Sequence, residues 1–305
     1  MFEKKIKFLL GSKTTIISNN KIFDPLILDF FTDVSRLIFS NKKKIIYKEI
    51  ISLGYWCRKA NLEKFKKNYV TNDIKVGKGL AFHIVPSNVP INFVYSLAFG
   101  LLSGNSNIVR VSEEQNDIVN TTCKLINQIL KRRKYKKIFK ENAVITYKKD
   151  DNITKHFSSI SDCRVLWGSD DTIKTLRSYD AKVNCTDLIF ADRYSISIID
   201  IKKINRKNIN KLVNNYFIDT FLMDQNACSS PHLVVWLNLN KNYINNKTFF
   251  WEKLYKLSKK NYTFGFSKSY QKLTRSFENI ISLKNSTQNF KNLNQILHLT
   301  KIKNI

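Results

Sequence analysis

Several motifs that would indicate a function at once are missing from this sequence. It contains neither a GxGxxG nor a GxxxxGK[ST] loop, so the standard dinucleotide and P-loop fingerprints are absent. Its five cysteines form no CxxC pair and no cluster with histidine, which argues against zinc. No uncharged apolar stretch approaches the roughly 18 residues of a membrane span, and no signal-peptide core follows Met1. Scattered cysteines are typical of a reducing compartment, so we expect a cytoplasmic protein without a transmembrane segment.

Acidic side chains are also scarce. Lys and Arg number 52 against 24 Asp and Glu, which gives a formal net charge of +28. Such a charge attracts nucleic acid, acidic lipid or phosphate-rich ligands. The charge is spread evenly, however, whereas a nucleic-acid module concentrates it on one element. We therefore expect no specific nucleic-acid partner, and we interpret the densest run, 131–137, as cations at the end of a helix.

The sequence does contain an alternation of short apolar strands and amphipathic helices. Strands are expected at 79–86, 106–111, 143–146, 163–167 and 194–199. This alternation predicts βαβ units and a parallel, Rossmann-type sheet. Ligands of such sheets bind beyond the carboxyl ends of the strands, which makes candidates of the residues at 86–88, 110–112 and 168–169. We expect three segments along the chain: a helical N-terminal segment (1–70), a nucleotide-binding α/β domain (71–200) and a second domain (201–305).

One cysteine differs from the other four in its setting. Cys228 lies in a polar turn between an expected helix (208–222) and an apolar strand (233–237). At such a junction, backbone N–H groups or a helix end can stabilise a thiolate, which is the nucleophilic form. A half-buried structural thiol is the alternative. His232, four residues later, is a candidate for proton transfer only if its strand turns it toward the sulfur.

Asn88 lies in a loop that two prolines stiffen. Pro86 fixes its own φ, and Pro90 disfavours a helical conformation for the residue before it. A fixed amide suits a developing oxyanion, although an asparagine that caps the following helix is the alternative. His83, on the preceding strand, is expected to be a packed strand histidine.

A set of motifs in a fixed order carries a more specific signal. They are AFHIVPSNVP at 81–90 with its continuation at 96–105 and 109–112, VLWGSDDTI at 165–173, ADRYSIS at 191–197 and DQNACSSP at 224–231. Together they resemble the motifs of acyl-CoA reductases related to the bioluminescence long-chain fatty acid reductase, within the aldehyde dehydrogenase superfamily. The resemblance implies an aldehyde-dehydrogenase-like α/β fold in which 201–305 is a shortened catalytic domain.

The resemblance also implies roles for individual residues. Cys228 falls where the family has its acyl-accepting cysteine, and Asn88 falls where the family has its oxyanion asparagine. Gly168 and Ser169 fall at the turn that approaches the phosphates of the nicotinamide cofactor. The strand-end serines Ser87 and Ser112 are counted with this cofactor site.

Arg110 stands where the family has an adenosine-side lysine. Its guanidinium would suit a 2′-phosphate, which favours NADPH over NADH. A strand-end surface charge is the alternative interpretation of Arg110.

The implied reaction is reduction of a fatty acyl-CoA thioester to a fatty aldehyde through an acyl-cysteine, with hydride from NADPH. Aldehyde-oxidising members of the superfamily carry a water-activating glutamate, but the aligned stretch here, 190–193, is FADR. Within it, Asp192 and Arg193 form a local ion pair, or Arg193 faces the CoA phosphates. The implied partners are an acyl-CoA or acyl-protein donor, an acyl-protein synthetase and a second copy of the chain in a homo-oligomer.

The segment after Cys228 is shorter than the family's catalytic domain, which leaves an alternative function. A catalytically impaired short homologue would act as a binding partner in an acyl-transfer or reductase complex. Oxidation of NADPH that depends on Cys228 separates the enzyme from this alternative.

Overall fold

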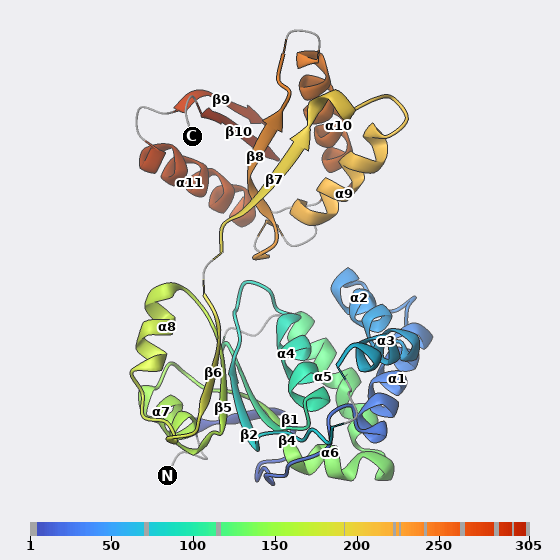
Figure 1. Cartoon of the computed structure of the whole chain (residues 1–305), viewed down its shortest axis with the longest axis vertical. Helices are drawn as coiled ribbons and strands as arrows, with labels where there is room; N and C mark the ends of the chain where they lie inside the picture. Colours follow the sequence, from blue (N-terminus) through green and yellow to red (C-terminus); the bar gives the residue numbers. More distant parts are fainter. Residues whose placement is uncertain are drawn as a thin grey trace. The chain divides into compact units, whose positions relative to one another are not determined.

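The computed structural model describes residues 5–69, 73–113, 117–191, 193–221, 224–225, 227–240, 243–262, 266–283, 287–294 and 296–302. The chain divides into two compact units, 1–192 and 193–305, and each is described by itself (Figure 1). The boundary expected near residue 70 stays a prediction.

The first unit is built on a six-stranded sheet of order β1-β4-β3-β2-β5-β6. Its strands are β1 Lys7–Gly11, β2 Leu80–Ile84, β3 Ser106–Val111, β4 Asn142–Thr146, β5 Cys163–Trp167 and β6 Thr186–Phe190. Strands β2 to β6 run parallel, and β1 is antiparallel beside β4. Every residue of β2 and β4 is buried, as expected of strands covered on both faces. The predicted parallel α/β sheet is confirmed.

The strand expected at 194–199 forms, but outside this sheet. As β7 (Ser195–Asp200) it pairs with a strand of the second unit, so the interpretation of it as the fifth strand of the first sheet is wrong. The strand beside β5 in the first sheet is β6, which was not predicted from the sequence. An edge strand is covered less than a central one, and in β6 exposed and half-buried residues alternate, so its apolar run is short.

Helices lie on both faces of the first sheet (Figure 1). One face carries α4 (Asn92–Leu102) and α5 (Asp117–Leu130), with α1 (Pro25–Ser40), α2 (Lys48–Trp56) and α3 (Lys59–Tyr69) beyond them. The other face carries α7 (Asp151–Ile160) and α8 (Asp170–Arg177). Apolar side chains of α7 and α8 complete the core over the sheet, and the ring of Phe157 lies 5.3 Å from that of Phe82.

The densest run of cations follows α5, and two of its side chains pair with carboxylates of α1. It forms a short 3-10 turn (Arg133–Tyr135) and α6 (Lys136–Glu141). Asp33 accepts from Arg132 at 2.9 Å and from the hydroxyl of Tyr135 at 2.8 Å, and Asp29 pairs with Lys134 at 2.8 Å. The hydrogen bond from Lys134 lowers the pKa of Asp29. These contacts therefore join the segment after α5 to α1.

The second unit contains a two-stranded parallel sheet of β7 and β8 (Pro231–Leu237). Helix α9 (Ile209–Phe221) connects the two strands and confirms the helix expected at 208–222, and α10 (Ile244–Asn261) packs against α9. Phe250 of α10 is fully buried among Tyr216, Trp236 and Trp251. The remaining elements are a 3-10 turn (Ile201–Lys203), α11 (Phe266–Leu283) and the hairpin of β9 (Thr287–Leu293) and β10 (Leu297–Ile302).

No helix in the described part of the chain is both long enough and apolar enough to cross a bilayer.

Candidate functional site

The strand order of the first sheet reverses between β2 and β5. The chain runs from β2 through β3 to β4 on one side and returns to β5 on the other side of β2. Two of the predicted site segments leave the sheet at this switch point, because Ser87 and Asn88 follow β2 while Gly168 and Ser169 follow β5. The side chains of Ser87, Asn88 and Ser169 are exposed. The structure therefore brings these two segments to the edge of the sheet where ligands of α/β folds bind.

Ser169 caps the helix that starts beside it. Its hydroxyl accepts from the backbone N–H of Thr172 at 3.4 Å, which fixes the N-terminus of α8. Asp170 and Asp171 occupy the first turn and offset part of the positive charge of the helix end. A Cβ at Gly168 would lie 2.9 Å from Thr172 Cγ2, so a larger residue there would force the Thr172 side chain to shift. The turn at 168–169 thus offers backbone groups rather than a strong cationic site.

An ion pair between the buried Arg164 and the half-buried Asp187 holds the other end of α8. Arg164 on β5 donates to both carboxylate oxygens of Asp187 on β6, at 2.7 and 2.8 Å. The same guanidinium donates to the carbonyl oxygens of Leu176 and Tyr179, where α8 ends. The hydrogen bond to Asp187 raises the pKa of Arg164. The sheet therefore positions α8, and with it the turn at 168–169.

Arg110 does not extend from its strand as an isolated surface charge. Its guanidinium carbon lies 5.2 Å from the centre of the Tyr147 ring, just beyond β4. Tyr147 is buried, which raises its pKa. Ser112 lies beyond β3 on the same edge, and its carbonyl oxygen accepts from the hydroxyl of Thr146 at 3.0 Å. Arg110 and Ser112 are thereby brought together with the end of β4.

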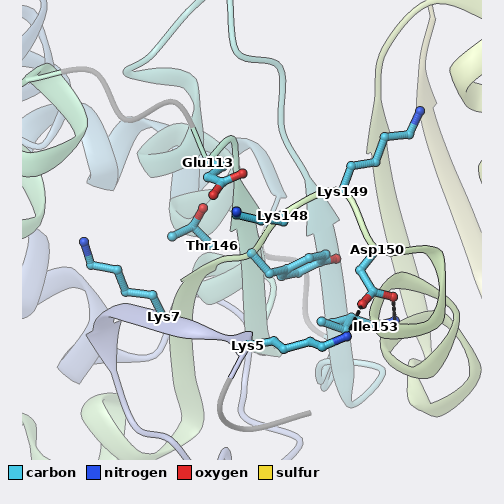
Figure 2. A pocket seen from close by; sticks show the side chains of 9 residues that line it. Lys5, Lys7, Glu113, Thr146, Lys148, Lys149, Asp150 and Ile153 are labelled. Atoms are coloured by element: carbon cyan, nitrogen blue, oxygen red, sulfur yellow. Dashed lines mark hydrogen bonds and ion pairs between the residues drawn. The ribbon is translucent and has the colours of Figure 1, made fainter.

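A pocket opens at this edge of the sheet (Figure 2). It is lined by Lys5, Lys7, Glu113, Thr146, Tyr147, Lys148, Lys149, Asp150 and Ile153. Lys5 pairs with Asp150 at 3.1 Å and lowers the pKa of that carboxyl. Lys148 lies beside Glu113 and Thr146, whereas Lys149 points away from them (Figure 2). The pocket combines an aromatic ring with several cations and one carboxylate that forms no ion pair in the described part of the chain.

Most of this pocket was not predicted from the sequence. The predicted candidates lie at the ends of the first, second and fourth expected strands, although the same rule for parallel sheets also covers residues 147–150, after the third. Lys5 and Lys7 could not be found in this way, because only the antiparallel pairing of β1 with β4 brings them there.

His83 lies inside the first unit, as expected of a packed strand histidine. Its Nδ1 lies 2.8 Å from the hydroxyl of Ser96, and its Nε2 lies 3.0 Å from Oδ1 of Asn107. The amide nitrogen of Asn107 donates to Asn142 at 2.8 Å, so Oδ1 of Asn107 is the acceptor and Nε2 of His83 carries the proton. Burial lowers the pKa of His83 to about 4.

Cys228 belongs to the second unit, in the loop between α9 and β8. Its side chain is exposed, and its carbonyl oxygen accepts from the hydroxyl of Ser195 at 2.6 Å. The loop is tied at both ends: the side-chain amide of Gln225 donates to Pro231, and the buried hydroxyl of Ser230 donates to Asp219. A nucleophile requires an accessible thiol, and here the thiol lies on a loop that hydrogen bonds restrain.

His232 is the second residue of β8, which follows this loop. Its ring lies 5.6 Å from the ring of Tyr194, and burial together with the charge of Arg275 lowers its pKa. A neutral imidazole near pH 7 is able to accept a proton, so proton transfer by His232 stays a prediction. Asp192 lies outside the described residues, and the choice between the two interpretations of Arg193 stays open.

Solved structures of aldehyde dehydrogenases share this fold. An NAD-dependent benzaldehyde dehydrogenase from Corynebacterium glutamicum matches with a TM-score of 0.60 at 13% identity, over 90% of this chain and 65% of the other. A glyceraldehyde-3-phosphate dehydrogenase, GapN, from Methanocaldococcus jannaschii complexed with NADP matches with a TM-score of 0.54 at 14% identity, over 77% and 54%. The fold is that of the aldehyde dehydrogenases.

Sequence comparison identifies the family within this class. The model of the family described as acyl-CoA reductase (LuxC) matches residues 47–296, and the chain belongs to this family. A curated relative, long-chain acyl-protein thioester reductase 2 of Photobacterium leiognathi, is 27% identical over 162 residues, which are 52% of this chain and 32% of the relative. A long-chain acyl-protein thioester reductase of Aliivibrio fischeri is 26% identical over 165 residues. The chain thus spans about a third of the length of these curated relatives.

Proposed function

We propose that the protein reduces a fatty acyl thioester to a fatty aldehyde through an acyl group on Cys228. The observation that carries this proposal is the exposed thiol of Cys228 on a tied loop in a chain of the acyl-CoA reductase family. The Cys228 thiolate attacks the carbonyl carbon, the bond from that carbon to the donor sulfur breaks, and the donor leaves as a thiolate. The acyl-cysteine accepts a hydride, and the adduct releases the aldehyde and regenerates the Cys228 thiolate.

Asn88 and the backbone N–H of Cys228 are the proposed donors to the oxyanion in both steps. Asn88 suits this role because the loop between Pro86 and Pro90 restrains it and its side chain is exposed. Loss of one such donor typically costs about 2.7–4 kcal/mol in the barrier. The stretch at 190–193 offers no glutamate to activate water, which favours reduction over oxidation.

The proposed cofactor is NADPH, which supplies the hydride when bound. Gly168, Ser169 and Ser87 lie at the switch point and would contact its phosphates. The pocket beyond β3 and β4 is the proposed site of the adenosine half, since Tyr147 is among its lining residues and Glu113 adds a carboxylate for ribose hydroxyls. Arg110 and Lys148 would attract a 2′-phosphate. Beside them, the hydrogen bond from Thr146 to the carbonyl oxygen of Ser112 joins the ends of β3 and β4.

The proposed donor is a fatty acyl-CoA or an acyl-protein, since the curated relatives are named for acyl-protein thioesters. An acyl-protein synthetase partner and a homo-oligomer follow from the family resemblance and are part of the proposal. We also propose a reducing cytoplasmic setting, because all five cysteines are free thiols.

Oxidation of NADPH in the presence of long-chain acyl-CoA tests this function. Wild-type protein should oxidise NADPH and release aldehyde, and Cys228→Ala should abolish both. Cys185→Ala is the matched control, because Cys185 is the only other cysteine that is not buried, and it should leave the rate unchanged. Binding of NADPH and acyl-CoA without turnover, in wild type and Cys228→Ala alike, would favour a non-catalytic binding partner instead.

A further inference from the structure

The loop that carries Cys228 begins with two residues in an unusual conformation. Asp224 and Gln225 both have positive φ angles, 53° and 62°, and neither is glycine. Residues other than glycine adopt this region at a cost and keep it where the surrounding structure holds them. Such residues are often found beside functional groups.

Hydrogen bonds of the backbone already end α9 at this point. The N–H of Gln225 donates to the carbonyl oxygen of Thr220 at 2.6 Å, and the N–H of Asp224 donates to that of Phe221 at 3.3 Å. This is the pattern with which a left-handed residue closes a helix. These two backbone hydrogen bonds already close α9. A further contact that Asp224 makes with the segment after α10 therefore needs another explanation.

That further contact comes from Tyr262, directly after α10. Its hydroxyl donates to Oδ1 of Asp224 at 2.6 Å. Its ring packs edge-on against Phe221 at 5.1 Å, and the ammonium group of Lys272 lies 4.3 Å from the ring centre. Its backbone N–H donates to Ser258 at 2.8 Å. Burial and the neighbouring Asp224 raise the pKa of Tyr262, so the phenol stays a donor at neutral pH.

We propose that Tyr262 is a positioning residue for Cys228. Its hydrogen bond to Asp224 fixes the start of the loop, so that the thiol and the backbone N–H of Cys228 face the acyl carbonyl together. This inference rests on the proposed function of Cys228 as acyl acceptor. It predicts that Tyr262 matters for attack on a thioester, which requires both groups, and not for alkylation, which requires only an accessible thiolate.

Two rates on the same proteins test this role. The first is formation of the acyl adduct on Cys228 from tetradecanoyl-CoA, followed by intact mass, and the second is alkylation of Cys228 by iodoacetamide. Tyr262→Phe and Asp224→Ala should slow acylation by about tenfold to a hundredfold, as small misplacements of reacting groups do, and leave alkylation within about twofold. Asp224→Asn should restore acylation, because its amide oxygen accepts from Tyr262 and asparagine tolerates the left-handed region. Asp224→Gly, which relieves the backbone but removes the acceptor, should stay slow.

Tyr255→Phe is the matched control, since Tyr255 also belongs to the α10 segment but its hydroxyl accepts from Asn294. The proposal is overturned if Tyr262→Phe acylates at the wild-type rate, if its two rates fall together, or if Tyr255→Phe is equally slow. A wild-type protein that alkylates but never acylates would instead overturn the proposed function, and this inference with it.

Discussion

The guanidinium of Arg110 is stacked on the ring of Tyr147, with the guanidinium carbon 5.2 Å from the ring centre. Arg110 comes from β3 and Tyr147 follows β4, the next strand of the sheet. This contact holds a permanent positive charge beside Tyr147, which lines the pocket, because arginine is not deprotonated in proteins. It is the basis for the prediction of cofactor preference.

Arg110→Leu should weaken NADPH binding by about tenfold or more and leave NADH binding within about twofold. A hydrogen bond to a charged group contributes about 1.5–3 kcal/mol, and 1.4 kcal/mol corresponds to a tenfold change in Kd. Titration of each cofactor by protein fluorescence measures the two constants. Lys174→Leu, on the exposed surface of α8, serves as the control. Equal weakening of both cofactors would argue against recognition of the 2′-phosphate by Arg110.

The ion pair of the buried Arg164 with the half-buried Asp187 should matter for stability. Asp187→Leu should lower the free energy of unfolding by about 3–5 kcal/mol, because it leaves the guanidinium of Arg164 buried without its charge partner. The double variant Arg164→Met with Asp187→Leu should lose less than the sum of the two single changes. Urea unfolding of the four proteins measures this coupling. Additive losses would show that the two residues do not act as a pair.

His83 should make the protein less stable as the pH falls from about 6.5 to about 4. Burial lowers its pKa to about 4, so the unfolded chain binds this proton at a higher pH than the folded protein does. The stability is complete above the unfolded pKa and declines by about 3 kcal/mol as the pH reaches the folded pKa.

The pH dependence of urea unfolding for wild type, His83→Gln and His156→Gln measures this effect. His83→Gln should remove most of the slope, whereas His156→Gln, an exposed histidine, should keep it. Asp29 and Asp162, whose pKa values are lowered, act below this range. A slope in His83→Gln as steep as that of wild type would contradict the assignment.

Cysteine labelling of the native protein should be selective. Cys228 is exposed and Cys185 is half-buried, whereas Cys57, Cys123 and Cys163 are buried. Burial raises the pKa of Cys123 to about 12 and that of Cys163 to about 11, which leaves almost no thiolate at neutral pH. Peptide mapping after brief treatment with iodoacetamide should find Cys228 modified first, Cys185 second and the others only in urea. Early modification of Cys123 would show that the first unit opens more readily than its burial implies.

The sequence predicted the parts of the fold that rest on strong local patterns. The runs around Phe82, Val109 and Leu166 are short, rich in apolar residues and buried, as central parallel strands require. It missed β6 and misplaced β7, because the pairing partner of a short strand depends on contacts that are distant in the sequence. The pairing of Ser195 with Pro231 is one such contact.

The candidate site was predictable to the same extent. Asn88 and Ser169 follow strands of the sheet and Arg110 lies at the end of one, so one topological rule located them. Lys5 and Tyr262 reach their sites through β1 and α10, and no local pattern indicates either approach. The tertiary structure supplied these residues.

Intact-mass analysis after incubation with tetradecanoyl-CoA, without cofactor, tests the role of Cys228 most directly. The account predicts one added acyl group, located on Cys228 by peptide mapping, sensitive to hydroxylamine, absent in Cys228→Ala and lost from wild type when NADPH is added. An adduct that persists in Cys228→Ala, or no adduct on a thiol that iodoacetamide labels readily, would contradict it.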